Sequence, residues 1–103
     1  MATDNGPSAS YPVVAPRGDL DTDTLGPLTT ELDAAAARHP VVILDASGIT
    51  FSDSSFLRLV LLTHRRTELR IAAAPPAVAR LFQLISVDAM LHLYPTLDAA
   101  RAA

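Results

Sequence analysis

The stretch VVILDASGITFSDSSFL, residues 41 to 57, indicates the fold class of this chain. It opens on Val41 to Leu44, a continuous apolar run rich in β-branched residues, which is typical of a central strand buried on both faces. Ser47 and Gly48 break this run, and an Asp-Ser-Ser sequence from Asp53 begins an amphipathic segment. A buried strand followed within ten residues by a helix predicts an α/β architecture.

Strand-like and helix-like segments alternate on both sides of this stretch. A first strand is predicted over Tyr11 to Ala15, at the edge of a sheet, because Pro12 and Pro16 each remove a backbone donor. The other expected elements are helices beginning near Asp21 to Asp23, at Asp53, at Pro75 and Pro76, and at Thr96, and strands over Leu69 to Ala73 and Leu91 to Tyr94. This alternation predicts an α/β fold with a mostly parallel or mixed sheet of about four strands, packed with about four helices.

Chain length predicts one domain. At 103 residues the chain is too short to build two separate cores, so residues 11 to 103 are expected to form a single unit. Residues 1 to 10 mix Gly, Pro, Ser and Asn without apolar periodicity, and they are therefore predicted to be a flexible tail.

Apolar spacing also predicts which side chains face inward. In the helix that Asp21 to Asp23 would cap, apolar side chains recur at steps of three and four, at Leu25, Leu28, Leu32 and Ala36. The helix after Pro75 repeats this pattern at Val78, Leu81, Phe82 and Ile85. A turn is expected at Arg17 to Asp19, and Ile49 and Phe51 are expected on one side of a short extended link.

Composition and charge exclude several classes of function. The absence of cysteine excludes disulfides, thiolate metal sites and a cysteine nucleophile. The N-terminus lacks a secretory signal and no apolar run approaches the roughly 20 residues that span a bilayer, so a cytoplasmic protein is expected. A net charge of -3 argues against nucleic acid binding, which needs clustered Lys and Arg. The basic cluster is interpreted as a solvated helix face: Arg58, His64, Arg65, Arg66 and Arg70.

The start of the second predicted helix is a candidate modification site. Asp53 is a good N-cap, which puts Ser54 and Ser55 in the first turn, exposed and reachable. A phosphate on Ser54 would add nearly two negative charges, which the helix dipole favours and Asp53 opposes. The fold should therefore tolerate the phosphate, whereas a partner packed against it should not.

Three motifs resemble those of STAS domains, the family of sulfate transporter and bacterial anti-sigma factor antagonist domains. The central stretch LDASGITFSDSSFL, residues 44 to 57, resembles the family pattern of Leu-Asp-x-Ser, Val or Ile with a following Phe, and Asp-Ser-Ser-Gly-Leu. Gly18 to Asp21 resembles Gly-Glu-Leu-Asp, and Pro76 to Phe82 resembles Pro-Ala-Val-x-Arg-Leu-Phe. The resemblance covers roughly residues 11 to 100 and implies a single STAS-like domain.

The resemblance also implies a function in partner switching. In such a system an anti-sigma factor that is also a serine kinase phosphorylates the first Ser after the Asp, which is Ser54 here, with Ser55 as the second choice. The unphosphorylated antagonist binds the anti-sigma factor and releases the sigma factor, and a metal-dependent serine phosphatase resets it. The implied protein is a monomer or weak dimer, is not an enzyme, and needs no cofactor or metal. The expected partner-binding residues are Asp21, Asp23, Asp53, Ser54, Ser55, Phe56 and Arg58.

Three departures from the family pattern carry expectations of their own. Phe56 replaces the family's Gly and is either a core residue or an exposed docking anchor, so we predict that Phe56→Gly alters partner affinity or phosphorylation more than folding. Only Thr67 and Glu68 replace the usual Gly-Gly turn, which predicts a shortened helix end. A single Pro-flanked strand replaces the usual two at the N-terminus, so the sheet is expected to lack an edge strand.

Alternative functions remain open beside this one. The chain could be a STAS subunit of another complex, such as a lipid-transport assembly, in which Ser54 is never phosphorylated. A serine hydrolase is disfavoured because ten helical residues put Ser54 about 15 Å from His64, and His92 comes without the glycine-flanked elbow of hydrolases. A magnesium site would use Asp21, Asp23, Asp45 and Asp53, but helix caps and turns are the commoner explanation for such carboxylates.

Overall fold

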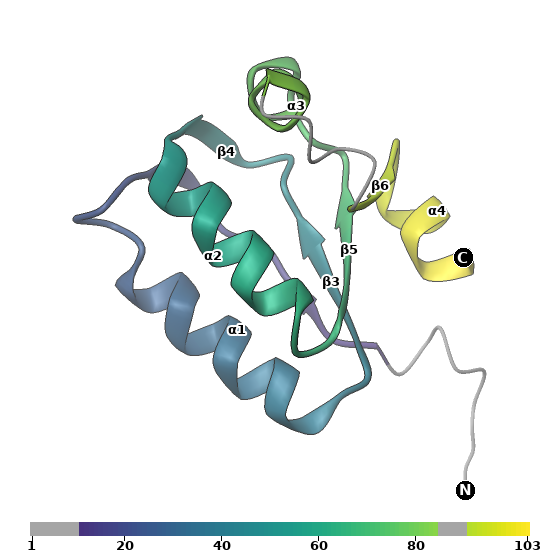
Figure 1. Cartoon of the computed structure of the whole chain (residues 1–103). Helices are drawn as coiled ribbons and strands as arrows, with labels where there is room; N and C mark the ends of the chain where they lie inside the picture. Colours follow the sequence, from purple (N-terminus) through teal and green to yellow (C-terminus); the bar gives the residue numbers. More distant parts are fainter. Residues whose placement is uncertain (1–10, 85–90) are drawn as a thin grey trace, which may run out of the picture.

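The computed structural model describes residues 11–84 and 91–103, and strands and helices alternate along them as predicted (Figure 1). The elements are β1 (Val13–Val14), β2 (Gly18–Leu20), α1 (Gly26–Arg38), β3 (Val41–Asp45), β4 (Ile49–Ser52), α2 (Ser54–His64), β5 (Glu68–Ala72), α3 (Pro76–Leu84), β6 (His92–Tyr94) and α4 (Leu97–Ala102). The predicted tail over residues 1 to 10 and the predicted inward position of Ile85 lie outside the described residues.

Four strands form one parallel sheet in the order β1-β3-β5-β6, which confirms the predicted sheet. The central pair, β3 and β5, is in register from Val41 opposite Glu68 to Asp45 opposite Ala72. β1 is an edge strand, as the prolines around it predicted, because an edge strand can lose donors on its outer side.

β3 is buried on both faces, as its continuous apolar run predicted. Val42 and Leu44 belong to the main core beneath α1 and α2, whereas Ile43 packs with Ala72 and Ala100 on the opposite face. Figure 1 shows α1 and α2 side by side on one side of the sheet and α4 on the other. The two-residue period of a strand therefore explains why every position from Val41 to Leu44 is apolar.

α1 begins later than the sequence predicted. Its N-cap position is Leu25, which makes no side-chain capping bond, and a proline stands in its first turn. The expectation that Asp21 to Asp23 cap this helix is wrong, because Asp21 Oδ1 instead accepts from the backbone N of Asp23 (2.9 Å) and of Thr24 (3.2 Å). The inward positions of Leu28 and Leu32 are confirmed, since both are buried.

A second, two-stranded parallel sheet joins β2 to β4. The expected turn at Arg17 to Asp19 is therefore wrong, and so is the expectation of a single N-terminal strand. Gly18 begins β2 with φ +84, a conformation that glycine adopts without strain, and its backbone N donates to Gly48 O at 2.9 Å. Two short strands thus follow β1 and β3 in parallel and carry the chain towards α1 and α2.

A register shift in this small sheet turns Phe51 towards solvent. Gly18 pairs with Ile49 but Asp19 pairs with Phe51, so β4 has one extra residue, Thr50, opposite β2. Such a bulge interrupts the alternation of faces. The expectation that Ile49 and Phe51 share a side is therefore wrong, because Ile49 is buried whereas Phe51 is 54% exposed.

The last two helices begin at the residues that sequence predicted. α3 starts at Pro76 and buries Val78 and Phe82, and Thr96 Oγ1 caps α4 by accepting from Ala99 N at 3.0 Å. α2 ends at His64, and Thr67 Oγ1 in the following connection donates to His39 O at 2.9 Å. No helix within residues 11–84 and 91–103 has both the length and the apolar content that a bilayer crossing needs.

Candidate functional site

The first turn of α2 is built by Asp53, as the sequence predicted. Its carboxylate Oδ1 accepts from the backbone N of Ser55 (2.9 Å) and of Phe56 (3.4 Å), and its own backbone is extended. These bonds satisfy two of the donors that every helix leaves unpaired at its N-terminus. Ser54 therefore stands at the first helical position with its side chain exposed.

The two serines of the motif differ in their surroundings. Ser55 is a half-buried residue whose Oγ lies 2.8 Å from Thr22 Oγ1, so its hydroxyl is engaged in a hydrogen bond. Within residues 11–84 and 91–103 no hydrogen bond involves the Ser54 hydroxyl, which faces solvent. The Ser54 hydroxyl is thus the more accessible of the two.

The Thr22–Ser55 bond brings the turn of residues 21 to 24 beside the first turn of α2. This turn is itself braced, because Asp21 N donates to Thr24 Oγ1 (2.9 Å) and Thr24 Oγ1 donates to Asp19 O (2.8 Å). We call the resulting surface the α2 edge and define it as Asp19, the turn of residues 21 to 24, Phe51 and residues 53 to 55.

The α2 edge is acidic. Its carboxylates come from Asp19, Asp21, Asp23 and Asp53, so five of the seven residues predicted to bind a partner gather at or beside it: Asp21, Asp23, Asp53, Ser54 and Ser55. Asp19 is an addition that sequence reasoning missed, although it lies in the Gly18 to Asp21 motif. Within the described residues, no three acidic or histidine side chains are grouped so that they could hold a metal ion.

Phe56 belongs to the core and not to the docking surface. Its side chain is 0% exposed and stacks on Phe82 with ring centroids 6.4 Å apart. The interpretation of Phe56 as an exposed partner-binding residue is therefore wrong, because a fully buried ring cannot touch another protein. The physical reason is that Phe56 lies two positions after the exposed Ser54, and at about 100° per residue these two positions are on nearly opposite sides of the helix.

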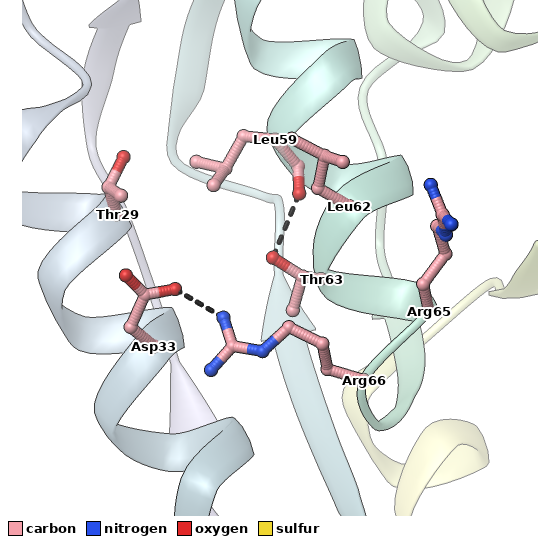
Figure 2. Close-up of a pocket in the computed structure, with 7 residues that line it drawn as sticks. All are labelled: Thr29, Asp33, Leu59, Leu62, Thr63, Arg65 and Arg66. Carbon is pink, nitrogen blue, oxygen red and sulfur yellow. Dashed lines mark hydrogen bonds and ion pairs between the residues drawn. The ribbon is translucent and has the colours of Figure 1, made fainter.

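Arg58, the seventh predicted residue, is exposed one helical turn beyond Ser54. Farther along, a groove of about 590 Å³ separates α1 from the end of α2 (Figure 2). Arg66 Nη1 crosses it to Asp33 Oδ1 at 2.6 Å, and Leu62 projects beside it. Arg58, Arg65 and Arg66 are all exposed, as expected for a solvated helix face.

Arg70 departs from that expectation, because it is 7% exposed and lies on the α4 face of β5. Its guanidinium donates from Nη1 to Ala100 O (2.9 Å) and from Nε to Glu68 Oε2 (2.7 Å), and lies 5.0 Å from the Tyr11 ring centroid. Burial opposes its charge, but the hydrogen bond and charge of Glu68 outweigh that effect. The pKa of Arg70 is therefore raised above its ordinary value.

The histidines do not form a catalytic pair with Ser54. His64 ends α2, at the opposite end of the helix from Ser54, and its Nδ1 accepts from Leu69 N at 3.3 Å. His92 lies beside His64, with ring centroids 5.3 Å apart. Neither ring is near the serine hydroxyl, so the geometry does not support a hydrolase, which needs a base within about 3 Å.

Several known proteins share this fold. A family model described as "Mlab, STAS domain" matches residues 7–93. An anti-sigma factor antagonist from Mycobacterium paratuberculosis is similar over 99% of this chain and 89% of its own, with 28% identity and a TM-score of 0.82. The anti-sigma factor antagonist SpoIIAA, in its unphosphorylated form, is similar over 81% of this chain and 79% of its own, with 21% identity and a TM-score of 0.67.

A more distant likeness concerns the fold alone. The STAS domain of a SulP transporter from Vibrio cholerae is similar over 89% of this chain and 78% of its own, with 13% identity and a TM-score of 0.69. No curated protein matches the chain. The family model covers most of the chain, and the antagonist from Mycobacterium paratuberculosis is similar over nearly all of it. The chain therefore belongs to the STAS domain family, and its type is that of the anti-sigma factor antagonists.

Proposed function

We propose that this chain is an anti-sigma factor antagonist of the cytoplasm that docks on an anti-sigma factor kinase through the α2 edge and is switched by phosphorylation of Ser54. The observation that carries the proposal is the exposed hydroxyl of Ser54, one residue after the Asp53 cap. It agrees with the likeness to the antagonist from Mycobacterium paratuberculosis. In this function the chain is a regulatory binding protein and not an enzyme.

The switch follows from electrostatics at the first turn of α2. A phosphoserine carries nearly two negative charges, and the unpaired backbone donors and dipole of a helix N-terminus favour them. The nearby carboxylates oppose them, so the two effects offset one another in the free protein. A docked partner changes this balance, because a doubly charged group at a contact must lose its water. Phosphorylation therefore leaves the fold intact and releases the partner.

Ser54 is favoured over Ser55 for a geometric reason. The Ser55 hydroxyl is bonded to Thr22, whereas the hydroxyl of the exposed Ser54 is bonded to no described residue. A kinase would have to break the Thr22 bond before the Ser55 hydroxyl could react. A metal-dependent serine phosphatase would reset the switch by hydrolysing the phosphate from the same exposed position.

The test is phosphorylation in a defined mixture. We expect one of the purified anti-sigma factor kinases encoded in the same genome to transfer phosphate from ATP, and mass spectrometry to place it on Ser54. Ser54→Ala should abolish the transfer, while the control Ser55→Ala should retain it. Phosphate on another residue would remove Ser54 as the switch. Binding to a kinase without any transfer would favour the alternative, an unphosphorylated STAS subunit of another complex such as a lipid-transport assembly.

A further inference from the structure

Phe51 is the one phenylalanine of three that the fold leaves in water. Phe56 and Phe82 are fully buried and stack on each other, whereas Phe51 is 54% exposed. Aromatic side chains favour burial strongly, since each carries a large apolar area. An exposed phenylalanine on a paired strand therefore needs a physical reason.

The exposure of Phe51 is produced by the backbone. The extra residue in β4, Thr50, interrupts the alternation that would have returned Phe51 to the side of buried Ile49. Thr50 Oγ1 donates to Asp19 Oδ1 at 2.7 Å, which ties the bulge to the neighbouring strand β2. Bulges of this kind re-aim side chains next to functional sites. The outward position of Phe51 is thus held by a specific pairing and is not an accident of a loose loop.

Phe51 lies within reach of the proposed phosphorylation site. Ser54 is three positions further along the chain, and three steps of extended chain span at most about 11 Å. Its cross-strand partner is Asp19, and Asp19 O accepts from Thr24 in the acidic turn of residues 21 to 24. The exposed ring of Phe51 therefore belongs to the same surface as the acidic turn of residues 21 to 24, the α2 edge. Among residues 11–84 and 91–103, the other large apolar side chains that are exposed, Leu62, Leu84 and Leu93, lie on other elements.

We propose that Phe51 is the apolar anchor of the docking surface, and that it enters an apolar pocket rimmed by Lys and Arg on the anti-sigma factor kinase. This inference rests on the proposed function and names the contact that carries it. A basic rim would complement the acidic α2 edge, on which Asp23 and Asp19, the strand partner of Phe51, are both exposed. A central aromatic side chain surrounded by polar contacts that exclude water is the arrangement that dominates binding energy in protein interfaces.

The anchor also explains how a phosphate on Ser54 could release the partner. When Phe51 is seated in its pocket, water is excluded from the surface around it. The phosphate dianion on Ser54, three positions along the chain, would then have to lose its water or force the Phe51 ring out of the pocket. Phe51 and Ser54 should therefore act on the same contact, so their effects on affinity should not be additive.

The test measures the affinity of purified variants for the purified anti-sigma factor kinases of the same genome. We expect Phe51→Ala to raise the Kd by about tenfold or more, with the thermal unfolding midpoint unchanged because the ring is exposed. Phe51→Lys should raise the Kd further, since it presents a cation to a basic rim. This variant should also fold, because position 51 is exposed, and it therefore checks the result for Phe51→Ala. The matched control is Leu62→Ala, which truncates a side chain that is 46% exposed in the α1–α2 groove and should leave the Kd unchanged.

Salt and double variants complete the design. Asp23→Asn should weaken the salt dependence of the Kd, and Phe51→Ala combined with Ser54→Asp should bind no more weakly than the weaker single variant. If the wild type binds a kinase and Phe51→Ala binds it with the same Kd, the anchor is overturned but the proposed function is not. Wild-type protein that binds none of the kinases would overturn both the anchor and the proposed function. A loss of affinity in Leu62→Ala as large as in Phe51→Ala would place the contact in the α1–α2 groove instead.

Discussion

The hydroxyl oxygens of Thr22 and Ser55 lie 2.8 Å apart although 33 residues separate them in the chain. This bond fastens the acidic turn of residues 21 to 24 to the first turn of α2. It thereby decides two properties of the site at once. It occupies the Ser55 hydroxyl, and it sets which carboxylates stand near the exposed Ser54.

The Thr22–Ser55 bond should be worth little to stability but should position the turn. We expect Thr22→Ala and Ser55→Ala each to lower the free energy of unfolding by less than about 1 kcal/mol, because the bond is exposed. In urea unfolding the double variant should lose less than the sum of the singles, since one bond is removed in all three. The control is Thr30→Ala, whose hydroxyl bonds only within α1. Strictly additive losses would show that the hydroxyls are not coupled in solution.

Ser54→Asp should separate folding from binding. The helix N-terminus favours the added charge and Asp53 opposes it, so the thermal unfolding midpoint should stay nearly unchanged. Affinity for the kinase partner should fall by about tenfold, because the charge must be desolvated at the contact. Thr30→Asp adds the same charge on the exposed face of α1 and should not alter affinity. Equal Kd values for wild type and Ser54→Asp would remove the switch.

Phe56→Ala should damage the fold. Because the ring is fully buried against Phe82, its truncation should cost about 3–5 kcal/mol of unfolding free energy. Phe56→Gly should cost still more, since glycine also weakens a helix. This reverses the prediction made from the family pattern, which assigned the effect of Phe56→Gly to partner affinity. Phe51→Ala is the matched control and should change stability by less than about 0.5 kcal/mol. Urea unfolding that cannot distinguish the two alanine variants would contradict the burial of Phe56.

Arg70 and Arg66 should respond differently to the same substitution. Arg70→Ala leaves the buried carbonyl of Ala100 without its donor and should cost about 2–4 kcal/mol. Arg66→Ala removes an ion pair whose side chains are 48% and 53% exposed, and should cost less than about 1 kcal/mol. The comparison is made by urea unfolding at neutral pH. Since the pKa of Arg70 is raised, its contribution is present at neutral pH and is lost only as pH rises through that pKa. Similar losses in both variants would argue against a structural function for Arg70.

The local pattern of residues was sufficient to predict most helices and strands and the residue at which α2 starts. The apolar run from Val41 to Leu44 predicts a strand buried on both faces, and Asp53 predicts a cap, because strand alternation and capping depend only on neighbouring residues. Pro76 and Thr96 locate the last two helices for the same reason. The exposed position of Ser54 follows from the Asp53 cap and needs no information from elsewhere in the chain.

Only the tertiary structure decided which side chains of these elements are buried and which are exposed. β2 has three residues and exists because it pairs with β4, and the extra residue Thr50 in that pairing turns Phe51 outward. Phe56 is buried because Phe82 meets it from α3, and Arg70 is buried because α4 offers it the carbonyl of Ala100. These contacts join residues 26 to 32 positions apart, where hydrogen bonding and packing override local periodicity. The sequence by itself therefore determined the α/β order and the exposed serine, while the tertiary contacts determined which phenylalanine is core and which is surface.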